Sequence, residues 1–337
     1  MNVSPGRIAK DSRNERASVG LTLCTIGELL VEFLSRNPHQ KFTHPGEFVG
    51  PFPSGAPAIF AAQVARLGHR AMIFGCVGND DFGRLNIERL RHEGVIVDGI
   101  RVMNNAVTGT AFVSYQSPQE RDFIFNIPDS ACGLFTEKDI DPQLLQQCQH
   151  IHIMGSSLFS FRMIDATRKA MMAIKAAGGT VSFDPNIRKE MLNIPEMEQA
   201  FDYLIEYTDI FLPSESELPF FARHKNLSEE HIISDLLQAG VKHVVVKRAQ
   251  RGASYYHLQD GELQALHLPG YTVETVDPTG AGDCFGATFV TLFLSGLPAA
   301  EALHYANASG AIAVTQQGPM EGIASLSEID DFLRRQR

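Results

Sequence analysis

Short apolar runs rich in β-branched residues alternate with helical patterns through most of this chain. The strand-like runs are residues 21–31, 71–77, 150–154, 180–183, 209–212 and 241–246. Apolar residues recur at helical spacing in segments between them, which are residues 56–67, 81–93, 164–177 and 228–239. A regular alternation of this kind favours a mainly parallel sheet with helices on both faces. The chain is therefore predicted to be an α/β protein of three layers.

Two segments near the N-terminus, residues 33–53 and 107–127, lack long helical patterns. The second alternates apolar and polar residues over 111–115 and again over 121–125. A period of two is typical of half-buried antiparallel strands. We expect both segments to form a small antiparallel β lid beside the main sheet.

A glycine-rich turn, Asp-Pro-Thr-Gly-Ala-Gly-Asp at residues 277–283, lies between a strand-like run, 271–276, and a helical pattern that ends at Gly296. Glycines allow backbone N–H groups to converge on one point, and a helix N-terminus adds a partial positive charge, so the turn suits a phosphate group. Asp283 is poorly placed to bind that anion but well placed to take a proton from a hydroxyl that attacks phosphorus. A plain helix N-cap is the alternative role for Asp283.

Other phosphate-binding loops fit less well. The chain has no Gly-x-x-x-x-Gly-Lys-Ser/Thr sequence, which excludes a P-loop. Gly280 and Gly282, followed by Gly286, come close to the dinucleotide fingerprint, but the third glycine is one position late. Asp283 would also face the pyrophosphate and repel it. The turn therefore indicates phosphoryl transfer to a hydroxyl rather than dinucleotide binding.

Length and charge narrow the class of partner. With 337 residues the chain can form one large α/β domain, which we expect over 21–337, with the polar residues 1–20 as a disordered tail. The formal net charge of -10 argues against nucleic acid or an anionic membrane as the partner, and no apolar stretch is long enough to span a membrane. The five cysteines are widely spaced without a Cys-x-x-Cys pair, which is typical of a reduced, cytoplasmic protein.

The glycine-rich turn, extended to Phe285, is similar to the C-terminal signature of the ribokinase-like (PfkB) carbohydrate kinases. Further segments resemble motifs of that family in the same order, and these are residues 55–68, 75–83, 183–188, 244–247 and 307–311. The resemblance covers about residues 21–335 and is nearest to the branch of fructokinases, 2-keto-3-deoxygluconate kinases and tagatose kinases. It implies a ribokinase-like fold and an ATP- and Mg²⁺-dependent kinase that acts on a small carbohydrate.

The resemblance also implies a role for each matching residue. Asp283 would be the catalytic base, and the amides of Gly280, Ala281 and Gly282 would bind the transferring phosphoryl group. The residues implied for sugar binding are Glu32, Gly55, Ala56, Ile59 and Arg188. Those implied for nucleotide binding are Asn186, Ser214, Lys247, Arg248, Gly252 and Asn307. Those implied for metal ions are Glu217, through Mg²⁺-bound water, and Asp277 with Thr279, at a monovalent-cation site for K⁺.

Several positions depart from the family's pattern. Ser54 replaces a glycine, and Ile59 stands where many members have an asparagine that binds a sugar hydroxyl. The family's acidic residue near Glu32 is most often the shorter aspartate, and Ala249 takes a common glycine position. We therefore expect the sugar pocket and the adenine side to differ from those of typical members.

Structural alternatives stay open for several of these residues. Ser214 and Glu217 also match a capping box for a following helix. Asp277 is suited to an Asx-turn that leads into the glycine-rich turn. Glu28 and Glu32 are predicted to close the first strand, and solvent exposure at a strand end is the alternative to sugar binding.

The lid bears on the choice of sugar. Enzymes that phosphorylate 2-keto-3-deoxygluconate often carry an arginine at the end of a lid strand, where this chain has Ile127. Because the loss of a bidentate partner is costly for carboxylate binding, we favour a neutral ketohexose of fructose or tagatose type, phosphorylated at a primary hydroxyl. 2-Keto-3-deoxygluconate, a nucleoside and a catalytically silent sugar-binding sensor are the alternatives. Arg121 is expected to be solvated, and Phe123 and Phe125, taken as exposed, favour a homodimer through the lid.

Overall fold

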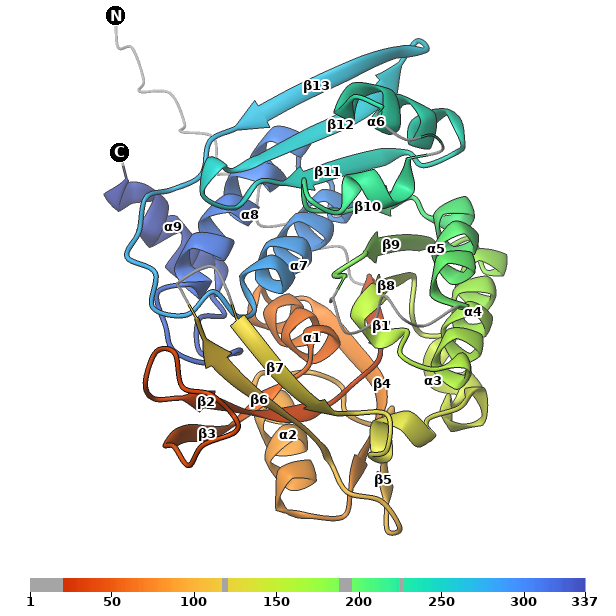
Figure 1. Cartoon of the computed structure of the whole chain (residues 1–337). Helices are drawn as coiled ribbons and strands as arrows, with labels where there is room; N and C mark the ends of the chain where they lie inside the picture. The colour runs from red at the N-terminus through yellow and green to blue at the C-terminus, as the bar shows by residue number, and fades with distance from the viewer. Residues whose placement is uncertain (1–20, 117–120, 188–195, 223, 225–226, 337) are drawn as a thin grey trace, which may run out of the picture.

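The computed structural model describes residues 21–116, 121–187, 196–222, 224 and 227–336. The tail expected over residues 1–20 and the predicted sugar-binding residue Arg188 lie outside the described residues. Figure 1 shows a large central sheet with helices on both sides and a smaller sheet beside it.

The central sheet has nine strands within the described residues, in the order β13-β12-β11-β10-β9-β8-β1-β4-β5. Their bounds are β1 Thr22–Ile26, β4 Arg70–Gly78, β5 Ile100–Met103, β8 His150–Met154, β9 Thr180–Asp184, β10 Ile210–Phe211, β11 His243–Lys247, β12 Ala253–Gln259 and β13 Glu262–Leu268. Neighbouring strands from β5 to β11 are parallel, whereas β12 and β13 extend one edge as an antiparallel hairpin. The mainly parallel sheet predicted from the sequence is confirmed.

Helices cover both faces of this sheet (Figure 1). One face carries α1 Ala56–Arg66, α2 Asp81–His92, α7 Ala281–Leu294 and α8 Ala299–Ala313, with α9 Leu326–Arg335 packed on α8. The other face carries α3 Pro142–Leu145, α4 Phe161–Ala176, α5 Glu196–Tyr207 and α6 Glu229–Gln238. A separate hydrophobic cluster lies under each set, so the sheet is buried on both sides. The predicted three layers are confirmed.

The smaller sheet has the strand order β3-β2-β6-β7. Its strands are β2 Leu30–Ser35, β3 Phe48–Ser54, β6 Gly109–Tyr115 and β7 Arg121–Asn126. The pairs β2–β3 and β6–β7 are antiparallel, as expected, but β2 and β6 join the two pairs in parallel. Each sequence segment folds back on itself locally, whereas the pairing between distant segments is set by how both pack on the domain.

The first predicted strand, residues 21–31, is wrong as a single strand. It contains β1 of the central sheet and the start of β2 of the smaller sheet, with a break at Gly27. A Cβ on Gly27 would lie 2.2 Å from the hydroxyl oxygen of Ser157, so this close passage needs glycine. Glu28 therefore lies between two sheets and Glu32 lies inside β2, not at the end of the first strand. A continuous apolar run gives no sign that the chain changes sheets.

The strand predicted over residues 271–276 is also wrong. This segment pairs with neither sheet in the described structure. The N–H groups of Val276 and Asp277 both donate to the carbonyl oxygen of Val314, and Tyr271 and Val273 pack on the cluster around α9. Tyr271 and Val273, which suggested a strand, pack against helices instead, and Val276 is exposed.

Candidate active site

A cavity of about 520 Å³ lies where the smaller sheet meets the N-termini of α1 and α7 and the C-terminal ends of β9 and β11. We call it the junction cavity. Of the site residues predicted from the sequence, those that line it are Glu32, Gly55, Ala56, Ile59, Asn186, Lys247, Thr279, Gly280, Gly282 and Asp283. Segments from the beginning, middle and end of the chain therefore meet in one place. Ligands of open α/β sheets commonly bind at this carboxyl edge of the strands.

The glycine-rich turn leads directly into α7, and Gly280 caps the N-terminus of this helix. The φ of Gly280 is 80°, and a Cβ here would lie 2.4 Å from the carbonyl oxygen of Pro319, so only glycine fits. Ala281 and Gly282 form the first turn of the helix. The first N–H groups of a helix lack partners within the helix and are available to an anion placed before it. The turn thus has the backbone geometry of an anion-binding site.

Asp283 is the third residue of α7 and lines the junction cavity, with 7% of its surface exposed. The alternative role of this residue as an N-cap is wrong, because Gly280 takes the cap position. A carboxylate in the first turn, beside an anion-binding backbone, is placed to accept a proton from a group in the cavity. The position of Asp283 therefore suits a catalytic base, and this role stays a prediction.

Asp277 supports the turn from inside the protein, where only 1% of its surface is exposed. Its Oδ1 accepts hydrogen bonds from the N–H and the hydroxyl of Thr279, at 3.0 and 2.7 Å. Its Oδ2 accepts one from the N–H of Gly318, at 3.0 Å. The Asx-turn is therefore present, and the K⁺ site at Asp277 and Thr279 stays a prediction.

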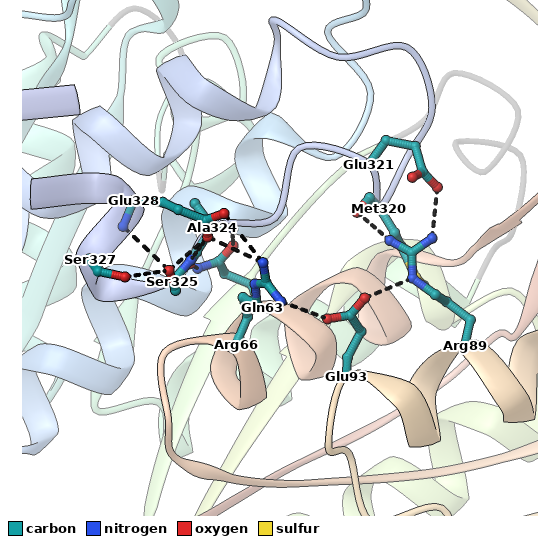
Figure 2. A network of polar contacts seen from close by, with 10 residues as sticks. All are labelled: Gln63, Arg66, Arg89, Glu93, Met320, Glu321, Ala324, Ser325, Ser327 and Glu328. Atoms are coloured by element: carbon teal, nitrogen blue, oxygen red, sulfur yellow. Dashed lines mark hydrogen bonds and ion pairs between the residues drawn. The ribbon is translucent and has the colours of Figure 1, made fainter. Parts of the chain in front are cut away.

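The segment that packs under Gly280, which we call the support loop, is residues 318–325. Figure 2 shows how side chains of α1 and the C-terminal end of α2 hold it. The Gln63 carboxamide donates to the carbonyl oxygen of Ala324 at 2.8 Å and accepts from its N–H at 2.9 Å. Arg89 of α2 donates to the Met320 carbonyl oxygen and pairs with Glu321. The support loop is thereby fixed to the helix whose N-terminus lines the junction cavity.

We expect Gln63→Ala to lower the free energy of unfolding by about 3 kcal/mol, because it leaves the buried N–H and carbonyl of Ala324 without partners. Gln63 is fully buried. Urea unfolding measures the change. Arg66→Ala is the matched control on the same helix, since the Arg66–Glu328 pair is exposed and contributes at most about 1 kcal/mol. Equal midpoints for the two variants would show that Gln63 does not anchor the support loop.

Two buried acids lie at the side of the cavity formed by the smaller sheet. Glu32 accepts a hydrogen bond from the hydroxyl of Ser54 at 2.7 Å, and Glu28 accepts one from the hydroxyl of Ser157 at 2.6 Å. Both line the cavity and have no more than 7% of their surface exposed, so the strand-end alternative is wrong. Ser54 and Glu32 both depart from the family's pattern, and the hydroxyl of Ser54 thus orients the carboxylate of Glu32. Glu28 was noticed in the sequence but not predicted as a site residue.

The N-terminus of α1 forms another wall of the cavity. Gly55 has a φ of 119°, and a Cβ here would lie 2.2 Å from the carbonyl oxygen of Glu28, which excludes any side chain. Ala56 and Ile59 follow on the cavity side of the helix. The Cγ2 of Ile59 lies 3.5 Å from the position of a Cβ on Gly280. Ile59 therefore packs between the helix and the glycine-rich turn and gives this wall an apolar surface.

The lid strand β7 turns one face towards the cavity. Arg121, Phe123 and Phe125 line the cavity, and Arg121 donates a hydrogen bond to the hydroxyl of Thr279 at 2.8 Å. The expectations of a solvated Arg121 and of outward-facing Phe123 and Phe125 are wrong. The apolar residue of β7 that faces solvent is Ile124, with 42% of its surface exposed. The alternation of residues along this strand was visible in the sequence, but which of its two faces points into the protein was not.

Lys247, at the end of β11, forms an ion pair with the buried carboxylate of Asp184, at the end of β9. Burial opposes the charge of Lys247, but the negative charges of Asp184, Glu217 and Asp283 outweigh it and raise the pKa of the ammonium group. Asp184 also accepts a hydrogen bond from the N–H of Asn186 at 3.1 Å. Asp184 lines the cavity but was not predicted as a site residue.

Glu217 and Ser214 interact as the sequence suggested, but outside an α-helix. Glu217 accepts hydrogen bonds from the N–H and the hydroxyl of Ser214, at 2.6 and 2.7 Å, and from the N–H of Ile187 at 2.7 Å. The predicted helix is a 3₁₀ turn, Leu218–Phe221, because the chain turns back at once to pack the ring of Phe221 on the core. Neither residue lines the junction cavity.

Acidic residues that could bind Mg²⁺ are dispersed. The described residues contain no group of three or more histidine, cysteine, aspartate or glutamate side chains that could hold a metal ion. Mg²⁺ commonly binds to one or two carboxylates together with the phosphates of a nucleotide. The dispersed carboxylates of the described residues therefore fit an ion that arrives with a nucleotide. Glu217 is close enough to Lys247 for its negative charge to raise the pKa of that ammonium group.

The remaining residues predicted for nucleotide binding lie outside the cavity lining. The Asn307 side chain donates to the carbonyl oxygens of Leu268 and Pro269, and a Cβ on Gly252 would lie 2.1 Å from the same Leu268 oxygen. Gly252 and Asn307 therefore both lie against the chain at Leu268 and Pro269. The Arg248 guanidinium pairs with carboxylates of Glu215 and Glu229, so its side chain is used within the protein.

Comparison with known proteins places this geometry in a family. The model of the pfkB family carbohydrate kinases matches residues 21–325. The chain belongs to this family. Fructokinase-2 of Zea mays is 31% identical over 319 residues, which are 92% of this chain and 93% of that protein. No helix in the described part of the chain is both long and apolar enough to cross a membrane.

Solved structures of pfkB-type kinases share the fold. An E. coli protein provisionally named ribokinase II, solved with ATP and Mg²⁺, is 51% identical and superposes with a TM-score of 0.88 over 94% of this chain and 99% of that one. Fructokinase of Vibrio cholerae O395, solved with fructose, ADP and calcium ion, is 26% identical with a TM-score of 0.79 over 93% of this chain and 99% of that one. The ribokinase-like fold predicted from the sequence is confirmed.

Proposed function

We propose that this pfkB kinase transfers the γ-phosphate of ATP to a primary hydroxyl of a ketohexose of fructose type. The observation that carries the proposal is the junction cavity, whose lining includes Asp283 and glycines of the glycine-rich turn together with the buried acids Glu28 and Glu32. Carboxylates accept hydrogen bonds from sugar hydroxyls. A sugar held by them can present one hydroxyl to Asp283.

The residues then act in sequence around the reacting hydroxyl. Asp283 accepts the hydroxyl proton as the oxygen attacks the γ-phosphorus. The amides at Gly280, Ala281 and Gly282 stabilise the negative charge that develops on the transferring group. Glu217 would orient, through water, the Mg²⁺ that arrives with the ATP phosphates, and the ion would supply positive charge against those phosphates. The smaller sheet acts as a lid that excludes water when Arg121 meets the turn at Thr279.

Four observations bear on the sugar class. Relatives and structural neighbours include proteins named fructokinase. The apolar Ile127 lines the cavity where a carboxylate-binding arginine was expected in kinases of sugar acids, which favours a neutral sugar. Arg121 places a guanidinium in the same cavity and favours 2-keto-3-deoxygluconate as the second candidate. The apolar wall around Ile59 suits the carbon side of either substrate.

We expect ADP release on mixing the protein with ATP, Mg²⁺ and fructose or tagatose, and slower release with 2-keto-3-deoxygluconate. A coupled assay over a panel of ketohexoses, aldohexoses, sugar acids and nucleosides measures kcat/KM for each. Faster turnover of the sugar acid would transfer the assignment to the second candidate. Absence of ADP release with the whole panel would favour a silent sugar-binding protein on this scaffold.

Further features of the proposed enzyme follow from its surface and composition. Residues 21–337 are proposed as one domain, with a homodimer through the outer face of the lid, where Ile124 is exposed. A monomeric mass in solution would contradict the dimer.

The five free, buried cysteines support the reduced environment of the cytoplasm. K⁺ is the proposed monovalent cation at Asp277 and Thr279.

A further inference from the structure

Lys247 differs from the other lysines that pair with a buried aspartate at the ends of the central strands. Lys175 and Lys242 both contact Asp209, and their side chains are 28% and 63% exposed. Lys247 has only 16% of its side chain exposed and pairs with Asp184, of which 1% is exposed. A lysine seldom enters the interior unless local charge compensates it. The position of this ammonium therefore calls for an explanation.

The ammonium of Lys247 faces the anion-binding turn. Its Nζ lies 3.8 Å from the position that a Cβ on Gly282 would take, and both residues line the junction cavity. The backbone of Lys247 is fixed, because its N–H donates to the carbonyl oxygen of Pro213 and its carbonyl oxygen accepts from the N–H of Glu215. The side chain thus extends from a rigid strand end towards the first turn of α7.

The charges in the cavity create a need for such a cation. Among the described residues, four carboxylates line it, from Glu28, Glu32, Asp184 and Asp283, against the two cations Arg121 and Lys247. A phosphoryl group that approaches the amides of the glycine-rich turn meets the carboxylate of Asp283 at close range, and the two negative charges repel each other. The ammonium has three donors, so it can keep its bond to Asp184 and also donate to a phosphoryl oxygen.

We propose that Lys247 is a catalytic residue of the kinase reaction proposed above. Its ammonium binds the oxygens of the transferring phosphoryl group, and Asp184 is the positioning residue that holds it there. A bond forms between the sugar oxygen and the γ-phosphorus while the bond from phosphorus to the bridging oxygen breaks, and its electron pair leaves with ADP. The hydroxyl proton goes to Asp283, and Lys247 remains protonated throughout.

The test compares Lys247→Met with Lys175→Met, which also removes a lysine from an aspartate pair but leaves Asp209 with Lys242. We expect Lys247→Met to lower kcat by roughly 10²-fold, as loss of a transition-state donor does, and Lys175→Met to leave it unchanged. Calorimetry with Mg·ATP and with ADP–aluminium fluoride plus sugar gives a second readout. Lys247→Met should bind ATP within about threefold of the parent yet lose roughly 10²-fold for the transition-state mimic.

Removing one partner of a buried pair can unfold a protein, whereas neutralising both is far less costly. The double variant Lys247→Met/Asp184→Asn is therefore made in parallel, and the same losses are expected in it. A kcat within about threefold of the Lys175→Met control, or equal losses for ATP and for the fluoride mimic, would overturn the assignment. If the parent itself shows no turnover with any sugar, the proposed function is wrong. If the parent and Lys247→Met are both active, the proposed function stands and only the role of Lys247 is wrong.

Discussion

Asp283→Asn is expected to lower kcat by at least roughly 10³-fold while the fold and sugar binding are retained, since a positioned general base contributes about 10²–10⁴-fold. Asparagine has the shape of aspartate but cannot accept the hydroxyl proton. Asp283 is nearly buried in the first turn of α7 and faces the junction cavity beside the anion-binding amides. Steady-state kinetics, with circular dichroism and sugar binding on the same sample, measures the effect.

The chain contains a matched control for the position in the helix. Glu328 is the third residue of α9, as Asp283 is of α7, and its side chain is partly exposed and bonded to Ser325. Glu328→Gln removes the same favourable charge at a helix N-terminus, worth about 0.3–1 kcal/mol, and should leave kcat unchanged. If Asp283→Asn keeps turnover within about tenfold of the parent, Asp283 is not the base.

Gly280→Ala is expected to lower kcat by roughly 10³-fold, near the upper end of the loss seen when an oxyanion donor is displaced. A Cβ at Gly280 would lie 2.4 Å from the Pro319 carbonyl oxygen, and the φ of 80° is unfavourable for alanine. Because the support loop is held by Gln63 and Arg89, it cannot move away easily, and the turn must shift instead. The amides then no longer converge on the phosphoryl group.

Gly296→Ala separates backbone strain from collision. Gly296 follows the other end of α7 with a φ of 94°, and a Cβ there would meet no atom within 4 Å. This control should lose about 1 kcal/mol of stability and keep kcat. Thermal unfolding and kinetics are measured on both variants. Equal kcat values would show that the close approach to Pro319 is not needed for the anion hole.

The sequence was most informative where structure depends on neighbours along the chain. The periodicities of residues 56–67 and 81–93 correspond closely to α1 and α2, because a helix buries one face at a spacing that local residues set. The glycine-rich turn was located correctly for the same reason, as glycines and a helix start define it locally. Apolar runs were less informative about partners: residues 21–31 span two sheets and residues 271–276 pack on helices.

Residue types near the turn predicted by themselves that this chain handles phosphate beside a carboxylate, and the match to the pfkB carbohydrate kinases agrees with that prediction. Tertiary structure alone decided which way Arg121 and Phe123 face, that Ser54 orients Glu32, and that Lys247 and Asp184 meet beside Gly282. These contacts join residues that are far apart in the chain, and a side chain's type says nothing about which distant atom it will meet. The phosphate chemistry could therefore be predicted from the sequence, whereas the walls of the junction cavity form only when the two sheets and α1 pack against one another.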